Sequence, residues 1–279
     1  METVNSLSGG KTSSFLATHY PADYEIFSLV CNDDIKCAHP DKKVMQLVND
    51  KLQKTSARFG ECIGTPENYL TIKVILDLEQ KIGKEIIWVR DESFDWWINY
   101  KKGLPNTNKR WCTSVMKMKP IFEWCFMNTD LPVKMRLGYR YDELERQERF
   151  TDKFDLATSC NTYGKKRQNW KKDIVWRTGE FPLIEDKVFH LPIYKWAKKS
   201  GLIFPKDSNC QNCFHKQPQQ LRKNFDDSPN VMQWAKQKEL ETKRTFKDNI
   251  KMKQIEKIGL QIDFNFGTGS GCQSGMCTD

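Results

Sequence analysis

The sequence predicts an α/β protein with a doubly wound, mostly parallel sheet. Short apolar runs bounded by turn residues alternate with longer segments in which apolar residues recur at helical spacing. A glycine-rich turn joins the first apolar run, 4–7, to the first helical segment, 11–19. We expect this α/β domain to cover residues 1–180, and a less regular, partly helical C-terminal region to cover 181–279.

The remaining elements follow in order along the chain. Short apolar runs predict strands at 24–31, 85–90 and 133–138, and helical spacing predicts helices at 40–58, 65–83, 93–101 and 120–128. Thr65 with Pro66 is a typical helix start, and Gly83 is a typical stop. In the helix at 93–101, Phe94, Trp97 and Tyr100 are expected to pack rather than to bind a ligand.

The C-terminal region is predicted to hold one long charged helix, from Ser228 to about Lys257. The tail at 267–279 is rich in glycine, which is typical of a flexible linker.

Composition narrows the class of protein. A hydrophobic content of 38% with 12% aromatic residues is enough for a packed core. We find neither an apolar run near the length of a membrane span nor a secretory signal, so we expect a cytoplasmic protein without membrane contact. Ten cysteines in such a chain indicate reduced thiols, metal ligands or redox groups rather than a disulfide framework. The net charge of +9 suits nucleotides or nucleic acid, although solvated lysine-rich faces are also common.

The first candidate site is the glycine loop Ser8-Gly9-Gly10-Lys11-Thr12-Ser13. Two glycines let backbone N–H groups approach an anion, and the following helix directs its unpaired N–H groups to the same place. The predicted ligand is a phosphate or a sulfate. A plain glycine turn capped by Ser8 is the alternative. A P-loop does not fit, because its first glycine would fall at Asn5.

Further candidates follow other predicted strands. Asp33 and Asp34 come after the second strand, where they would meet a ribose, a base or Mg²⁺, or form only a polar turn. Arg140 follows the last predicted strand and is expected to face the same crevice as the glycine loop. Beyond it, Asp142/Arg146 and Glu145/Arg149 have the spacing of helical ion pairs.

The cysteine pair Cys210-x-x-Cys213 has metal-ligand spacing. A tetrahedral site needs two more ligands, and Cys272 and Cys277 would supply them, as would Cys112 or His215. Such a set suits zinc or an iron–sulfur cluster. A redox pair and two unliganded thiols remain as alternatives.

Four segments carry a family resemblance: Ser8–Ser13, Arg110–Thr113 with Lys117 and Pro120, Leu137–Glu143, and Cys210–Lys216. In this order they resemble the phosphoadenosine phosphosulfate (PAPS) reductase-like branch of the PP-loop ATP pyrophosphatase superfamily. The resemblance runs from residue 4 to about residue 216. It implies an adenine nucleotide α-hydrolase-like fold whose glycine loop holds the phosphates or sulfate of ATP, adenosine phosphosulfate (APS) or PAPS.

The resemblance also implies roles for single residues. Arg110, Lys117 and Arg140 match positions that face the nucleotide, and Lys11 with Arg140 would stabilise charge developing on the phosphate or sulfate. Cys112 or a tail cysteine would carry sulfur or electrons. Members of the superfamily either cleave ATP between the α- and β-phosphates to activate a substrate, or reduce a sulfonucleotide with a thiol. Relatives that thiolate tRNA or DNA commonly carry an iron–sulfur cluster.

Two departures from the family pattern guide the choice among reactions. Thr12 stands where the PP-loop has an aspartate, which affects Mg²⁺ handling, and the Glu-Cys-Gly-Leu-His segment of true PAPS reductases is absent. We therefore favour nucleotide activation coupled to sulfur transfer. The alternatives are a component that modifies tRNA or DNA, and a nucleotide-binding protein without catalysis. The sequence is compatible with a homo-oligomer.

Overall fold

The computed structural model of the protein describes residues 1–157 and 170–259. Its centre is a sheet of five parallel strands in the order β3-β2-β1-β4-β7. The strands are β1 (Thr3–Leu7), β2 (Tyr24–Ser28), β3 (Ile86–Val89), β4 (Val133–Arg136) and β7 (Arg177–Glu180). The predicted α/β class with a parallel sheet is therefore confirmed.

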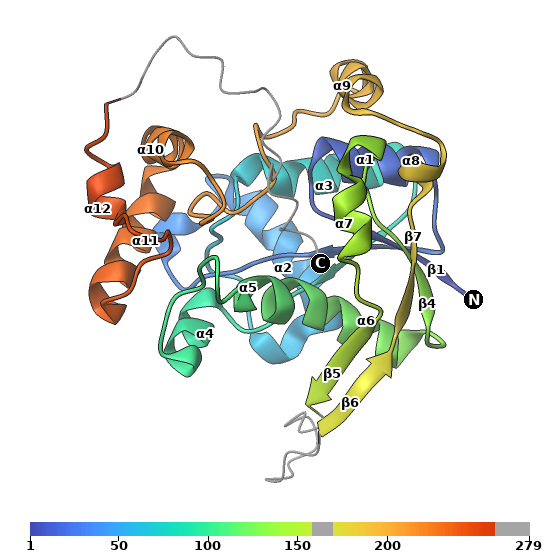
Figure 1. The fold of residues 1–279 in the computed structure, drawn as a ribbon, viewed down its shortest axis with the longest axis horizontal. Helices are drawn as coiled ribbons and strands as arrows, with labels where there is room; N and C mark the ends of the chain where they lie inside the picture. The colour runs from blue at the N-terminus through green and yellow to red at the C-terminus, as the bar shows by residue number, and fades with distance from the viewer. Residues whose placement is uncertain (158–169, 260–279) are drawn as a thin grey trace.

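The chain reverses its direction across the sheet between β1 and β4. It first builds β2 and β3 on one side of β1 and then returns to add β4 and β7 on the other side. Loops that leave neighbouring strands at such a switch point diverge, and a crevice opens beyond the carboxyl ends of the strands. The glycine loop follows β1 directly, so the topology places it at this crevice (Figure 1).

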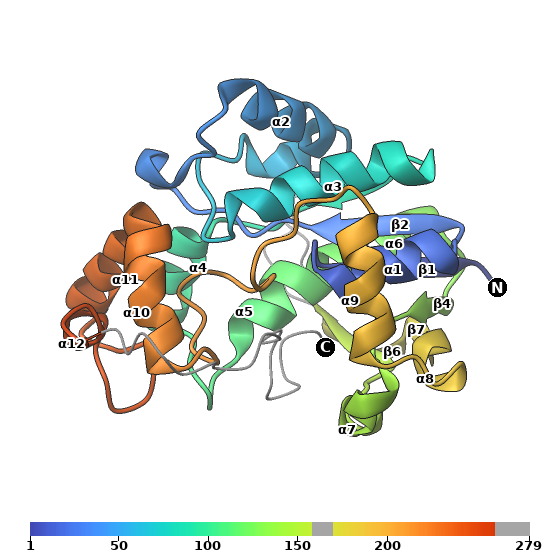
Figure 2. The same ribbon diagram turned by 90° about the horizontal axis from the view of Figure 1, so that it is seen from above.

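Helices cover both faces of the sheet. On one face, α2 (Lys42–Ser56) and α3 (Tyr69–Ile82) pack on Phe27 and Trp88. On the other face, α6 (Lys119–Asn128) packs on Val4 and Ile26. Phe27 and Ile26 are neighbours in β2, and adjacent strand residues point to opposite faces, so the apolar run predicted for this strand contributes to both layers. Figure 2 shows α2 and α3 at the top of the view.

Outside this sheet, β5 (Lys153–Ala157) and β6 (Trp170–Val175) form a separate antiparallel pair. The helix α1 (Lys11–His19) packs against α9 (His190–Lys199) through Phe15, Leu16 and Ile193. The domain boundary at residue 180 stays a prediction: the last sheet strand ends there, while α9 lies beyond it and packs on α1.

The C-terminal helices form a second apolar cluster with α4 (Phe94–Lys101). These helices are α10 (Pro218–Asp227), α11 (Pro229–Thr242) and α12 (Met252–Ile255), as Figure 1 shows. The short elements of the chain are α5 (Trp111–Thr113), α7 (Leu144–Glu148), α8 (Pro182–Glu185), a π-helical turn at Ser114–Met118, and 3₁₀ turns at Ile35–Cys37, Ala57–Phe59 and Tyr141–Glu143.

The prediction of a single helix from 228 to 257 is wrong. α11 ends at Thr242, and Lys243 has a left-handed backbone with φ of 54°. The buried Glu239 carboxylate then accepts hydrogen bonds from the backbone N–H groups of Phe246, at 3.0 Å, and Met252, at 2.7 Å. These bonds fold the chain back before α12. Helical charge patterning does not reveal a carboxylate that binds backbone groups further along the chain.

Three local predictions also need correction. The helix predicted to begin at Thr65 is α3, which begins at Tyr69. Its cap is Asn68, whose side chain accepts a hydrogen bond from the Leu70 N–H at 2.9 Å. The Thr65 hydroxyl instead donates to Val30 O at 2.7 Å. The strand predicted at 24–31 ends at Ser28. The Tyr100 side chain is 58% exposed instead of packed.

Among the residues that the structure describes, no helix combines the length and the apolar character needed to cross a membrane. The predicted glycine-rich tail at 267–279 lies outside those residues.

Candidate functional site

The glycine loop adopts a conformation that requires glycine at its second position. Gly9 has φ of +68°, and a Cβ built there would lie 2.6 Å from Cγ2 of Thr71 and 3.1 Å from its carbonyl oxygen. The loop is closed by Ser13, whose Oγ accepts from the Ser8 N–H at 3.2 Å and donates to Gly10 O at 3.2 Å. No side chain caps α1 at Gly10. The Ser8 hydroxyl contacts Ser13 Oγ at 3.2 Å and does not cap the helix, so the predicted cap is not seen, while a plain glycine turn remains the alternative to a phosphate site.

Gly9→Ala is expected to destabilise the fold by about 2–3 kcal/mol, because a left-handed alanine costs about 1–2 kcal/mol and the contact with Thr71 adds to this. The matched control is Gly83→Ala, where φ is +63° but nothing lies within 4 Å of the added Cβ. Urea unfolding of both variants measures the difference. Equal losses would contradict the close contact, and a Gly9→Ala/Thr71→Ser variant should recover part of the loss.

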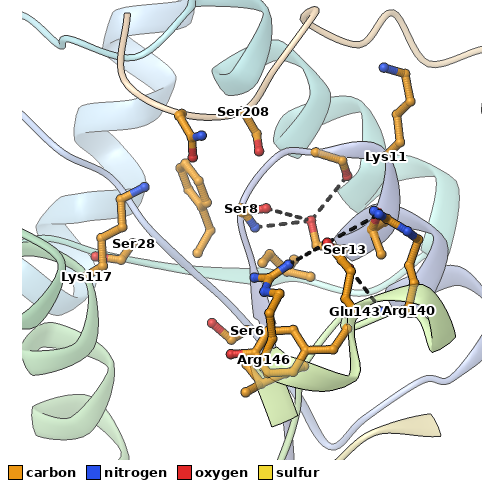
Figure 3. A pocket seen from close by; sticks show the side chains of 18 of the residues that line it. Ser6, Ser8, Lys11, Ser13, Ser28, Lys117, Arg140, Glu143, Arg146 and Ser208 are labelled. Carbon is orange, nitrogen blue, oxygen red and sulfur yellow. Dashed lines mark hydrogen bonds and ion pairs between the residues drawn. The ribbon is translucent and has the colours of Figure 1, made fainter. Parts of the chain in front are cut away.

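The loop opens onto a cavity of about 170 Å³ beyond the carboxyl ends of β1 and β4 (Figure 3). Its polar wall carries hydroxyl groups of the loop together with Ser28 and Ser208. Its apolar wall includes Phe27, Met135 and Trp176. Cations from well-separated parts of the chain line it: Lys11, Lys117, Arg140, Arg146, Arg177 and Lys206. Cations, hydroxyl groups and apolar side chains that line one cavity fit a ligand with a charged group and a flat ring.

Arg140 and Arg146 meet at Glu143 on one side of the cavity (Figure 3). The Glu143 carboxylate lies 3.3 Å from Arg140 Nη2 and 3.1 Å from Arg146 Nη1, and it also accepts from the Arg140 backbone N–H at 3.1 Å. The Arg146 guanidinium lies over the ring of Tyr139 at 4.2 Å. Two guanidinium groups are thus held in place at the cavity wall.

These contacts replace one of the two predicted helical ion pairs. Asp142 pairs with Arg140 at 3.0 Å rather than with Arg146. The pair Glu145/Arg149 is confirmed at 3.3 Å.

The segment 205–209 lies over the glycine loop. A Cβ at Gly10 would come within 2.9 Å of Ser208 Oγ, so the Ser208 side chain lies close to the loop backbone. Asp207 lines the cavity and pairs with the buried ammonium group of Lys216 at 2.7 Å. Burial lowers the pKa of Lys11, and the charge of Asp207 opposes this effect. In Figure 3 the Lys11 side chain extends away from Ser13.

A second, smaller cavity adjoins the first and is lined by Cys112, Cys210 and Cys213. Lys117, from the π-helical turn, lines both cavities. Its ammonium group lies 3.5 Å from a carboxylate oxygen of Glu67, whose side chain is 1% exposed. The fold therefore brings Cys112 to the same cavity as the distant pair Cys210 and Cys213, and Lys117 lines both this cavity and that of the glycine loop.

The protonation states in this region follow from burial. Burial raises the pKa of Cys112 to about 12, and it raises the pKa of Cys210 and Cys213 as well. Burial alone would lower the pKa of Lys117, but the charge of Glu67 raises it above its usual value. At neutral pH the second cavity thus holds neutral thiols beside a charged ammonium group. A bound metal or cluster would deprotonate these thiols outright.

The second cavity has the kind of ligand atoms that bind zinc or an iron–sulfur cluster, but these atoms are not arranged around one metal position. Three thiols are suitable ligands for zinc or an iron–sulfur cluster. Within residues 1–157 and 170–259, however, no group of three or more His, Cys, Asp or Glu side chains is gathered so as to hold one metal ion. Cys272 and Cys277, the predicted further ligands, lie outside the described residues.

Other predicted site residues lie elsewhere. Asp33 does not line the first cavity: its carboxylate accepts from the Ser93 hydroxyl at 2.7 Å, and its N–H donates to Asp95 at 2.9 Å. Arg110 precedes Cys112 without lining either cavity. The pKa of His215 is lowered to about 4, first by burial and then by the charges of Arg110 and Lys247, so this imidazole is neutral.

Sequence reasoning missed several residues of the first cavity, notably Glu143, Arg146, Asp207 and Ser208. Arg146 was expected only in a surface ion pair, and Asp207 lies in a segment without a motif. The signal for Arg146 is its place three residues after Glu143, which itself comes three residues after Arg140, so both arginines lie about one helical turn from the same carboxylate. No sequence signal identifies Asp207 and Ser208, because their place depends on the path of the chain after α9.

The fold and the cavity together define an α/β protein with a candidate ligand crevice at the switch point of its sheet. No protein-family model matches the chain, and no solved structure matches it. An uncharacterized protein of Methanocaldococcus jannaschii is 30% identical over 147 residues, which are 52% of this chain and 27% of that protein. The chain thus spans little more than a quarter of this relative's length.

Proposed function

We propose that this chain is a PAPS reductase-like member of the PP-loop superfamily that binds an adenine nucleotide at the glycine loop and couples it to sulfur chemistry. One observation carries the proposal: Lys117 lines both the glycine-loop cavity and the cavity of the three thiols. A nucleotide phosphate in the first cavity would lie on one side of this ammonium group, and the thiols lie on the other. Activation of a nucleotide and transfer of sulfur require such neighbouring sites.

Each part of the first cavity has a role in this proposal. The N–H groups at the start of α1 and the loop hydroxyls would bind the phosphate or sulfate. Arg140 and Arg146 would stabilise charge that develops on it, since guanidinium groups bind such oxygens in pairs of hydrogen bonds. The apolar wall with Phe27 and Trp176 would take the adenine ring. Glu143 and Asp207 supply the carboxylates that line the cavity, and both are already paired with cations.

The thiol cavity supports the sulfur part of the proposal. Cys112, Cys210 and Cys213 are thiols of the kind that carry sulfur or electrons, although in this arrangement they do not gather around one metal ion. Lys117 would hold its charge between the thiols and the nucleotide. Mg²⁺ would have to bind mainly through the nucleotide phosphates, because Thr12 offers no carboxylate.

Calorimetry with ATP, APS and PAPS tests nucleotide binding. We expect one of the three to bind, and Lys11→Ala to weaken its binding by about tenfold to a hundredfold, which corresponds to one charge-assisted hydrogen bond. The matched control is Lys73→Ala, since Lys73 is 47% exposed and pairs with Asp77 on the outside of α3. A wild-type protein that binds none of the three nucleotides would refute the proposal.

Product analysis then separates the possible reactions. Release of pyrophosphate from ATP supports nucleotide activation, and release of sulfite from APS or PAPS indicates reduction. If the protein binds nucleotide but releases neither pyrophosphate nor sulfite, it would be a nucleotide-binding protein without catalysis. Iron, sulfide and zinc analysis after anaerobic purification, repeated with Cys210→Ser, tests the thiol cavity directly.

Glu143→Gln is expected to tighten nucleotide binding by about tenfold at low salt, because it removes a negative charge beside the bound phosphate and keeps the side-chain shape. Calorimetry over a salt series measures the effect, which should shrink as salt rises. Glu145→Gln is the control, since Glu145 is 84% exposed. Weaker binding by the Glu143 variant would show instead that the carboxylate is needed to position Arg140 and Arg146.

A further inference from the structure

The helix α4 carries a pair of exposed aromatic rings that neither cavity uses. Trp96 is 41% exposed and Tyr100 is 58% exposed. Their rings are stacked, with centroids 5.1 Å apart and planes only 10° from parallel. Neither residue lines the two cavities. Two large rings kept together in water are costly unless a partner covers them, so this surface requires an explanation.

The charges around the rings favour an anionic partner. Lys101 and Lys102 follow Tyr100 directly and are exposed, and the ammonium group of Lys101 lies 5.6 Å from the centre of the Tyr100 ring. The one acidic residue of the helix, Asp95, is already neutralised by Lys238 at 2.9 Å. The exposed side of α4 is therefore aromatic and positively charged, without a free carboxylate of its own.

The position of α4 links this surface to the thiol cavity. The same helix contributes Phe94 to the wall of that cavity, while Trp96 and Tyr100 lie on its exposed side. The loop that follows α4 leads directly to α5, which carries Cys112, and passes the exposed Lys109 on the way. Figure 1 shows α4 at the edge of the molecule, close to α5. A chain held on α4 could thus continue toward the thiols.

We propose that the exposed side of α4 binds a single-stranded stretch of nucleic acid. Bases stack on aromatic side chains regardless of sequence, and lysines beside the rings bind the phosphates that join the bases. A duplex would not fit this mode, because its bases are already stacked on each other. Such a strand would be the polymer on which the nucleotide chemistry acts, a role that rests on the proposed function, whereas binding at α4 does not.

Fluorescence anisotropy with a labelled oligothymidine strand tests the proposal, with an oligouridine strand of the same length in parallel to determine the sugar preference. We expect the wild-type protein to bind single strands more tightly than a duplex of that length. Trp96→Ala and Tyr100→Ala should each weaken binding by about tenfold, whereas Trp96→Phe, which keeps a ring, should lose less. Replacing Lys101 or Lys102 by glutamine should lower the slope of log affinity against log salt by about one.

The control is Tyr69→Ala, since Tyr69 is 47% exposed but lies on α3. Thermal melts and ATP calorimetry of each variant verify that the fold and the nucleotide site are intact, so failure of this proposal is distinguishable from failure of the proposed function. The proposal is overturned if the wild type binds no single strand at low salt, or if Trp96→Ala binds as tightly as the wild type. Equal losses in the Tyr69 variant would overturn it too, because the loss would then not be specific to α4.

Discussion

Lys117→Met is expected to abolish nucleotide binding and to destabilise the fold by about 3–5 kcal/mol, the usual cost of removing one partner from a buried ion pair. The destabilisation arises because the Glu67 side chain is only 1% exposed. Without the Lys117 ammonium group, 3.5 Å away, its carboxylate would be buried without an opposite charge. Burial already raises the pKa of Glu67. Without Lys117 this carboxyl group would take up a proton more readily, so the loss of stability should shrink at acidic pH.

A double-mutant cycle separates the two effects of Lys117. Lys117→Met/Glu67→Gln removes both charges and should recover most of the lost stability, as measured by urea unfolding. It should not recover nucleotide binding, as measured by calorimetry. Recovery of both would mean that Lys117 serves only to balance Glu67, and the proposed contact with the nucleotide would then be wrong.

Glu25→Gln is expected to remove a pH dependence of stability worth on the order of 3 kcal/mol. Glu25 is 1% exposed in β2; its Oε1 accepts from Asn5 Nδ2 at 2.8 Å, while Oε2 is buried without a hydrogen-bond partner among the described residues. Burial raises its pKa from 4.5 to about 7, against the opposing hydrogen bonds from Asn5 and Ala22. Each unit of this shift corresponds to about 1.4 kcal/mol.

The sign follows from the direction of the shift. Because the folded-state pKa lies above the unfolded value, the folded protein binds the proton more strongly, and stability is lost as pH rises from 4.5 to about 7. The difference in unfolding free energy between the wild type and Glu25→Gln should therefore change across this window and stay constant outside it. For the control Glu145→Gln, whose side chain is 84% exposed, the difference in unfolding free energy from the wild type should not change with pH. A flat difference for Glu25→Gln would contradict the burial argument.

The strands and the glycine loop were predictable because their signals are local. The apolar run before Ser8 and the two glycines identify the end of β1 without knowledge of any distant residue. Arg140 was predictable for the same reason, since it follows a strand and strand ends meet at one edge of a parallel sheet. The break in the helix after Thr242 was not, because it depends on Glu239 binding backbone groups further along the chain.

The second half of the site depends on long-range contacts that local patterns do not encode. Cys112 and the pair Cys210/Cys213 are about a hundred residues apart in sequence, and spacing alone offered several sets of ligands. Glu67 had no predicted role, because its importance comes from the burial of Lys117 against it. Asp33 had a signal as strong as that of Arg140, yet Ser93 and Asp95 hold it away from the cavity.

The π-helical turn at Ser114–Met118 makes this part of the chain tolerant of a change in length. A π-turn accommodates one more residue than an α-helical turn over the same rise. Deleting one residue of the turn would therefore convert it to α-helix and leave the residues on either side in register. In an ordinary α-helix the same deletion would rotate the residues that follow by about 100°.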